Sequence, residues 1–204
     1  MDDALAHLKS HDSILSDVIE RYPAPSFQKH DNYYQSLVES IIGQQLSVKA
    51  AAAIRERFVG LFEDPFPSPQ QIVSIDVETY RSVGLSRPKA RYIIDLAEKV
   101  TDGSIRFDHL DGLSNQEIIE ELTVVKGIGV WTVHMFLMFC MGRLDVLPTG
   151  DLGIRNAVQK LYGFESIVTP EQVQVVANDN NWHPYESVAS FYLWKSLENT
   201  PVIS

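Results

Sequence analysis

The chain has 204 residues, 45% of them hydrophobic, which is enough for one domain or one compact two-lobed body with a substantial core. Its formal net charge of -10 argues against broad, non-specific binding to a polyanion, because neutralising phosphates takes many basic side chains on one surface. The single cysteine excludes an internal disulfide framework and any four-cysteine zinc or iron-sulfur site.

No part of the sequence combines a basic N-terminal region with an apolar run, and no segment approaches the ~20 apolar residues that span a bilayer. We therefore expect no secretion signal and no membrane association. The expected location is the cytoplasm of a bacterium or archaeon, or the nucleus of a eukaryote.

Apolar spacing and capping signals predict an all-α chain with almost no strand. About ten short helices with short connections are expected. In chain order they lie near 2–21, 31–45 and 47–60, after the capping-box sequence "SPQQ" at 68–71, from 87 to 100, after "SNQE" at 114–117, near 129–141, from 154 to 161, after "TPEQ" at 169–172 and near 184–198.

Basic and acidic residues are segregated along the chain. The window from Tyr80 to Ile94 holds no acid, and its basic residues are Arg81, Arg87, Lys89 and Arg91. Acids gather elsewhere, at Asp2, Asp3, Asp12, Asp17 and Glu20 and again at Glu117, Glu120 and Glu121. Taken alone, such segregation is typical of solvated helix faces.

Gly127 and Gly129 interrupt a helical pattern within "LTVVKGIGVWTVHMF" at 122–136. A glycine pair between helices allows left-handed torsions and lets several amide N–H groups point outward together, which suits a phosphate. The dipole of a helix that starts at Val130 would add to the attraction. The two glycines alone fit an ordinary αα-hairpin with a glycine C-cap at least as well.

Asp151 follows Pro148, Thr149 and Gly150 in "LPTGDLGIRNAVQKLYG" and opens a predicted helix. Aspartate is a favoured N-cap, so a structural role alone would account for it. A carboxylate held there would also be ionised and fixed in place. That combination suits an acid that must stay charged beside a developing cation.

Four blocks together resemble the helix-hairpin-helix DNA glycosylases, and among them the 3-methyladenine DNA glycosylase II type. They are "SLVESIIGQQLSVKAA" at 36–51, "VGLSRPKARYIIDLA" at 83–97, "LTVVKGIGVWTVHMF" at 122–136 and "DVLPTGDLGIRNAV" at 145–158. In addition, "WHPYESVASFYLW" at 182–194 is similar to the family's closing helix. The resemblance covers roughly Tyr34 to Leu197.

The resemblance implies a single all-α glycosylase domain over residues 1–204, with two lobes and an active-site cleft between them. The hairpin would occupy about 114–141. The N- and C-terminal helices would form one lobe and the central helices the other. The β-rich N-terminal domain of larger bacterial members is not expected in this chain.

The implied activity is monofunctional base excision. The enzyme would flip an alkylated purine out of duplex DNA and hydrolyse its N-glycosidic bond, leaving an abasic site. Asp151 would be the catalytic carboxylate that stabilises the oxocarbenium-like sugar. Relatives that also cut the backbone carry a lysine two residues after the second hairpin glycine. Trp131 stands there, so no Schiff base is expected.

Further site residues follow from their positions in these motifs. Trp131 and Trp194 fall where the family places pocket aromatics, whose faces attract a cationic base. His134 and Met135 are further pocket candidates, and Trp182 has weaker support. The intercalating position falls on Gln45, beside Gln44 and Leu46. Core packing is the structural alternative for the pocket residues, and a polar helix terminus capped at Ser47 is the alternative for the glutamines.

The hairpin and the basic stretch would bind phosphates of the DNA backbone. The residues expected to do so are Lys126, Gly127, Ile128, Gly129, Arg87 and Lys89. The backbone carbonyls of Thr123, Val125 and Gly127 would hold a structural monovalent cation, Na+ or K+. No cofactor is expected for catalysis.

The sequence is compatible with three other functions. A glycosylase for mismatched or oxidised bases is disfavoured by Trp131 and by the lack of a cysteine cluster. A non-catalytic hairpin module that binds DNA would not require Asp151 and the paired tryptophans. An acidic helical protein without a nucleic-acid role is supported only by the net charge. The expected partner is double-stranded DNA containing alkylated bases, bound by a monomer.

Overall fold

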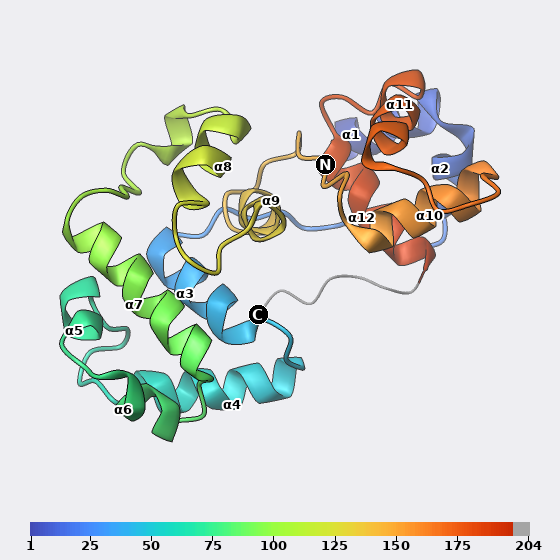
Figure 1. Cartoon of the computed structure of the whole chain (residues 1–204). Helices are drawn as coiled ribbons and strands as arrows, with labels where there is room; N and C mark the ends of the chain where they lie inside the picture. Colours follow the sequence, from blue (N-terminus) through green and yellow to red (C-terminus); the bar gives the residue numbers. More distant parts are fainter. Residues whose placement is uncertain (198–204) are drawn as a thin grey trace. The chain divides into compact units, whose positions relative to one another are not determined.

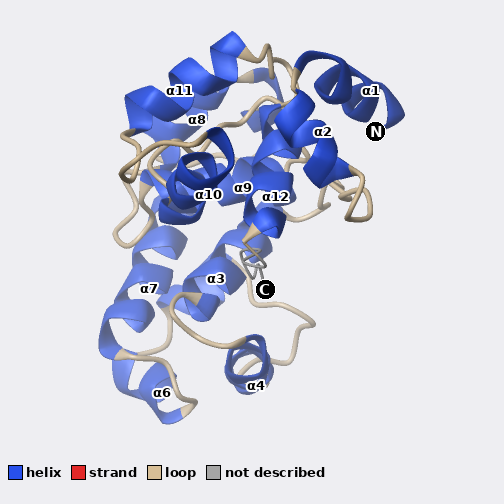
Figure 2. Cartoon of the chain, turned by 90° about the vertical axis from the view of Figure 1, so that its right-hand side faces the viewer, coloured by secondary structure: helices blue, strands red, loops and turns tan. Residues whose placement is uncertain are grey.

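The computed structural model describes residues 1–197, and every regular element within them is helical (Figures 1 and 2). The helices are α1 (Asp2–His11), α2 (Ser13–Ile19), α3 (Tyr33–Gly43), α4 (Val48–Val59), α5 (Pro69–Val73), α6 (Val77–Ser82), α7 (Arg87–Thr101), α8 (Asn115–Leu122), α9 (Val130–Phe139), α10 (Leu152–Tyr162), α11 (Pro170–Asp179) and α12 (Glu186–Ser196), with a 3-10 turn at Leu110–Gly112. This confirms the predicted all-α class. Across the described part of the chain, no helix is long and apolar enough to cross a membrane.

The chain divides into two compact units. Among the described residues, unit 1 comprises Met1–Lys29 and residues 137–197, and unit 2 comprises His30–Phe136. In unit 1, α12 packs against α1, α2 and α10, and α11 packs on α10. In unit 2, α7 packs against α3, α5 and α6, and α4 packs on α3 (Figure 1).

Most predicted helix starts are confirmed at the level of the cap. Ser68, Ser114 and Thr169 each form a complete capping box, and Pro69 and Pro170 occupy the first turn of their helices. The helix that begins at Val77 was not predicted from the sequence. It starts at Asp76, whose Oδ1 accepts the N–H groups of Glu78 and Thr79. The available signal in the sequence was the aspartate, which is a favoured N-cap.

The single helix expected near residues 2–21 is wrong, because Asp12 breaks it into α1 and α2. Asp12 has extended torsions, and its Oδ1 accepts the N–H of Leu15 at 2.8 Å. Its Oδ2 accepts the hydroxyl of Tyr162 and the indole N–H of Trp182. An aspartate that caps competes with helix continuation, and these buried partners decide the competition. Asp12 therefore belongs to the core of unit 1 rather than to a solvated face.

Candidate active site

Asp151 is the N-cap of α10, in unit 1. Its Oδ1 accepts the backbone N–H of Ile154 at 2.9 Å and the indole Nε1–H of Trp194, also at 2.9 Å. The residue is partly exposed. Two N–H donors that converge on one oxygen fix the direction of the carboxylate and surround it with positive dipole ends. The structure thus brings together two residues that the sequence analysis had assigned to the site.

Trp194 lies on α12 and is only 1% exposed. Its ring stacks on Phe139, with the ring centroids 6.4 Å apart and the planes 30° from parallel. The predicted stacking of Trp194 on a flipped base needs an accessible ring face, which this buried ring does not offer in the structure. Its visible contribution is the hydrogen bond to Asp151.

Gly153 makes this approach of the indole possible. A Cβ atom at this position would lie 3.0 Å from Asp151 Oδ1, 3.0 Å from Trp194 Cδ1 and 3.2 Å from Trp194 Nε1. Glycine in a helix costs about 0.5–1 kcal/mol relative to alanine, so its presence in the first turn of α10 indicates a need for space. Gly153 was not among the site residues predicted from the sequence. A glycine two positions after an N-cap was the signal.

The third tryptophan, Trp182, is fully buried in unit 1. Its indole N–H donates to the carboxylate of Asp12 at 2.8 Å, and its ring lies 6.2 Å from that of Tyr162. A ring held in this way is a core element. The weak support that it had as a pocket residue is therefore not strengthened by the structure.

In unit 2, the hairpin consists of α8, the turn around Gly127 and α9, which begins at Val130 as expected. Gly127 has φ +82°, and a Cβ there would lie 2.1 Å from Cδ2 of the Tyr92 ring. Only glycine meets both conditions. Gly129 has open space around its Cα, so no steric condition of this kind applies to it.

Asp95 of α7 holds the residue that precedes Gly127. Its Oδ2 accepts the backbone N–H of Lys126 at 3.0 Å, and its Oδ1 lies 2.9 Å from Lys126 Nζ. Burial acts to raise the pKa of the Asp95 carboxyl, but the two hydrogen bonds from Lys126 and the charges of Lys99 and Lys126 outweigh it and hold the pKa below its usual value. The hairpin turn is thereby tied to α7 by an ionised carboxylate.

The three pocket candidates on α9 belong to unit 2 and differ in exposure. The indole of Trp131 is 46% exposed, whereas Met135 is buried and His134 is partly buried. Burial lowers the pKa of His134, which favours the neutral imidazole. Trp131 therefore has the accessible aromatic surface that the prediction requires. Met135 fits the core reading better.

The predicted intercalation residues form the turn after α3. Gln45 has φ +58°, which non-glycine residues rarely adopt. The side-chain amide of Gln44 donates to the carbonyl oxygen of Gly127 at 2.9 Å. A surface cavity of about 220 Å³ adjoins this turn and is lined by Gln44, Gln45, Leu46, Ile54, Gly84, Leu85, Ser86 and Lys89.

The predicted phosphate-binding cations already have partners within unit 2. Arg87 pairs with Glu78 at 2.6 Å, and Lys126 pairs with Asp95. Lys89 Nζ donates to the backbone carbonyls of Ile42 and Gln44. The sequence shows that these residues are basic. Their partners come from other parts of the chain, so the sequence alone could not identify them.

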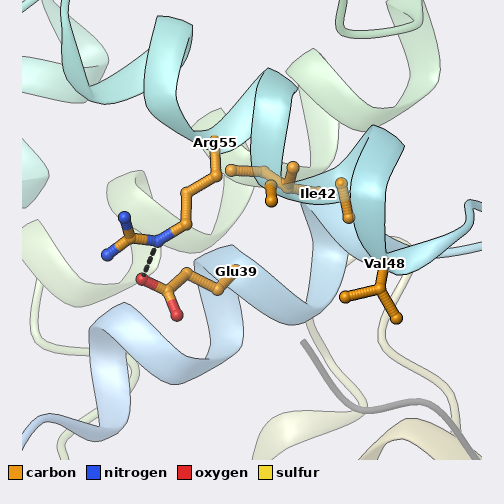
Figure 3. A pocket seen from close by; sticks show the side chains of 6 residues that line it. Glu39, Ile42, Val48 and Arg55 are labelled. Carbon is orange, nitrogen blue, oxygen red and sulfur yellow. Dashed lines mark hydrogen bonds and ion pairs between the residues drawn. The ribbon is translucent and has the colours of Figure 1, made fainter.

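A second cavity, of about 270 Å³, lies between α3 and α4 (Figure 3). An ion pair between Arg55 Nε and Glu39 Oε1 crosses its edge at 2.5 Å, and the rest of its lining is aliphatic. None of the predicted site residues lines it. Within residues 1–197, no group of three or more His, Cys, Asp or Glu side chains is arranged to hold a metal ion.

Comparison with known proteins identifies the family. Residues 38–179 match the HhH-GPD superfamily of base excision DNA repair proteins, which is more than half of the chain. The chain belongs to this superfamily. The matched span of the HhH-GPD domain contains the turn after α3, the hairpin and Asp151, and it ends before α12, which carries Trp194.

Several relatives of this HhH-GPD protein have related names. DNA-3-methyladenine glycosylase 1 of Schizosaccharomyces pombe is 38% identical over 176 residues, which are 85% of this chain and 76% of that protein. The structure of a DNA-3-methyladenine glycosidase from Bacillus halodurans matches with a TM-score of 0.82 and 38% identity, covering 95% of this chain and 88% of that one. The S. pombe 3-methyladenine DNA glycosylase in complex with abasic DNA matches with a TM-score of 0.79 and 34% identity, covering 96% and 97% of the two chains.

Proposed function

We propose that this HhH-GPD protein is a monofunctional DNA-3-methyladenine glycosylase of base excision repair. It flips alkylated purines out of duplex DNA and hydrolyses the N-glycosidic bond, leaving an abasic site. The observation that carries the proposal is the carboxylate of Asp151, held by the N–H groups of Ile154 and Trp194 in a chain 38% identical to a protein of that name.

The chemistry needs little from the protein beyond a fixed negative charge. Alkylation at a ring nitrogen turns the purine into a cationic leaving group, so cleavage leaves an oxocarbenium-like sugar. A carboxylate whose donors are already in place stabilises that cation without reorganising during the reaction. Asp151 supplies this charge, and the water that attacks the sugar completes the hydrolysis.

The base has to leave the stack before the bond can be reached, because the target atom is inaccessible in a duplex. The exposed indole of Trp131 offers a π-face on which a cationic base can stack. His134 and Met135 follow it on α9. On the DNA side, Gln45, with Gln44 and Leu46, fills the space that the flipped nucleotide vacates.

Trp131 also limits the reaction to base removal. A lysine at this place would attack the sugar carbon and form a Schiff base, which leads to strand cleavage. An indole cannot do so. We therefore expect abasic sites, with the DNA backbone left intact.

The hairpin would bind the strand near the lesion through the backbone N–H groups of Gly127 and Gly129, supported by Lys126 and Arg87, whereas the N–H of Ile128 donates to the carbonyl of Val125. Carbonyls of Thr123, Val125 and Gly127 remain the candidates for a structural Na+ or K+. The protein would act as a monomer on double-stranded DNA, in the bacterial or archaeal cytoplasm or in a nucleus.

The test is incubation with duplex DNA treated with a methylating agent, followed by chromatography of released bases and gel assay of the strands. We expect free methylated purines, together with strand breaks that appear only after alkaline or thermal treatment of the abasic sites. Immediate strand scission would instead indicate a lyase. Binding to the DNA without any release of bases would support the non-catalytic module.

A further inference from the structure

Three side chains of α7 lie on one face of the helix and reach the two segments that the proposed function assigns to DNA. They are Lys89, Tyr92 and Asp95, spaced three residues apart, so they follow one side of the helix. We call Gln44–Leu46 the wedge turn and Lys126–Gly129 the hairpin turn. The inference below rests on the proposed function, because it concerns how these two turns are held for DNA.

Lys89 binds the wedge turn. Its ammonium group donates to the carbonyl of Ile42 at 2.9 Å and to that of Gln44. These carbonyls lie at the C-terminal end of α3, where main-chain oxygens lack helical partners and the helix dipole favours a cation. Burial of Lys89 lowers the pKa of its ammonium, consistent with a group turned toward the protein.

Tyr92 and Asp95 bind the hairpin turn. The Tyr92 ring lies so close to Gly127 that a Cβ there would overlap it. Asp95 accepts both the backbone and the side-chain N–H groups of Lys126. The same helix face therefore holds the two turns by a charge-assisted bond at each end and an aromatic contact between them.

The two turns also contact each other directly, through the hydrogen bond from Gln44 Nε2 to the carbonyl of Gly127. This bond closes a ring of contacts in unit 2 that runs through Lys89, α7, the hairpin turn and Gln44. Gln45 has a left-handed backbone conformation, which is unfavourable for a non-glycine residue and persists only where the surrounding contacts hold it. The ring of contacts around the wedge turn holds Gln45 in this conformation.

We propose that the Lys89–Tyr92–Asp95 face of α7 is a positioning device that fixes the wedge turn relative to the hairpin turn. The wedge must enter the base stack at a set offset from the phosphates that the hairpin turn holds. A misplacement of about 1 Å can cost ~100-fold in rate. In this arrangement Lys89 acts within the protein and makes no phosphate contact.

The central experiment compares wild type with Lys89→Met, which keeps an unbranched side chain one atom shorter and removes its N–H donors. Single-turnover excision is measured at saturating enzyme on two DNAs that carry the same alkylated purine at one site. In the first the lesion is fully paired, and in the second it lies in a bulge, where little unstacking remains to be done. We expect a loss of about 10-fold on the paired duplex and less than about 3-fold on the bulge.

The salt dependence of binding separates positioning from phosphate contact. Loss of one phosphate contact makes the slope of log K against log salt concentration shallower by about 0.9, whereas a positioning residue leaves the slope unchanged. Lys160→Met is the matched control, since Lys160 is exposed in the last turn of α10 and the charge change is the same. A shallower slope, or an equal loss of rate on both DNAs, would overturn the proposal for Lys89.

Tyr92 supplies a second comparison that does not depend on Lys89→Met folding. Tyr92→Phe keeps the ring against Gly127, and Tyr92→Leu removes it. We expect the Phe variant to match wild type and the Leu variant to lose activity selectively on the paired duplex, with circular dichroism showing that both remain helical. Equal behaviour of the two variants contradicts the proposal. If wild type excises no base from either DNA, the proposed function fails instead.

Discussion

At the scale of single residues, Asp151 meets a structural requirement and, in the proposed function, a chemical one. It caps α10 through the N–H of Ile154, and the same oxygen receives the indole N–H of Trp194. The sequence already indicated a cap, because aspartate before a predicted helix is a strong signal. Trp194 could not be paired with it from the sequence, since the two residues are 43 positions apart and meet only in the folded unit.

Asp151→Asn should separate the two requirements. Asparagine is as good an N-cap as aspartate, so the fold should persist, whereas the negative charge is lost. We expect excision to fall by at least about 100–1,000-fold, the scale of losing one preorganised electrostatic group. Affinity for methylated duplex DNA should stay within about 3-fold of wild type. Asp179→Asn, an exposed change in α11 with the same chemistry, is the control. Normal excision by Asp151→Asn would remove Asp151 from catalysis.

Gly153→Ala should affect activity more than stability. The added Cβ would press on Asp151 Oδ1 and on the Trp194 ring at 3.0 Å, so one of them has to shift. Alanine gains about 0.8–1 kcal/mol in helix propensity, which offsets the strain. We expect the thermal midpoint to stay within about 3 °C and excision to fall about 10-fold. Gly112→Ala, where the space is open, should change neither. An active Gly153→Ala enzyme would show that the indole contact is dispensable.

At the scale of elements, most helix starts were predictable, although those of α2 and α6 were not, and the contacts between elements were not predictable. Capping boxes at Ser68, Ser114 and Thr169 depend on residues three apart, and all three form as expected. The contacts of Lys89 with the end of α3 join residues more than forty positions apart. The sequence therefore indicated the basic character of α7 but suggested phosphate as its partner.

The hairpin gives a direct test of element geometry through Gly127→Ala. The substitution forces a left-handed conformation on alanine, at about 1–2 kcal/mol, and drives Cβ into the Tyr92 ring. We expect a total loss of about 3 kcal/mol or more in free energy of unfolding, measured by denaturant titration. Gly129→Ala has open space and should lose less than about 1 kcal/mol. Adding Tyr92→Leu to Gly127→Ala should recover part of the loss. Equal costs at the two glycines would contradict the geometry.

The link between α7 and the hairpin also predicts a pH dependence. Asp95 has a pKa below its ordinary 3.8 in the folded protein, so its contribution to stability is complete above that value and is lost as pH falls through the lower, folded pKa. Asp95→Asn should cost about 1.5–3 kcal/mol near neutral pH, since hydrogen bonds to a charged group are broken. The difference from wild type should shrink as the pH is lowered below 3.8. A difference that stays constant in acid would mean that the charge of Asp95 plays no part.

At the scale of the whole molecule, the chain is acidic although its substrate is DNA. The partners of its basic residues bear on how it binds. The net charge is -10, and the basic residues Arg87 and Lys126 of unit 2 pair with carboxylates. Affinity for undamaged DNA should then come from few phosphate contacts, as the composition suggested. The all-α class was also readable from the sequence. That both ends of the described chain fold together in unit 1 was expected from the family resemblance and not from the spacing of residues.

Asp12 makes the clearest contacts between the N-terminal helices and the C-terminal part of unit 1. It is 1% exposed, and its two oxygens accept from the backbone of α2, from Tyr162 beyond the middle of the chain and from Trp182. Asp12→Ala would remove both acceptor oxygens and leave the three donors unsatisfied, at about 1–3 kcal/mol each. We expect a loss of at least about 3 kcal/mol, or a midpoint lower by about 6–12 °C.

Asp17→Ala changes another acid of the same N-terminal group. Asp17 is exposed on α2, so its removal should stay within about 0.5 kcal/mol of wild type. Asp12→Asn keeps an acceptor for Leu15 but presents an amide to the Trp182 and Tyr162 donors, and it should fall between the two. Both measurements use thermal unfolding followed by circular dichroism. If the Asp12 and Asp17 variants behaved alike, apolar packing alone would hold α1 and α2 against the rest of unit 1, and the buried carboxylate of Asp12 would not contribute.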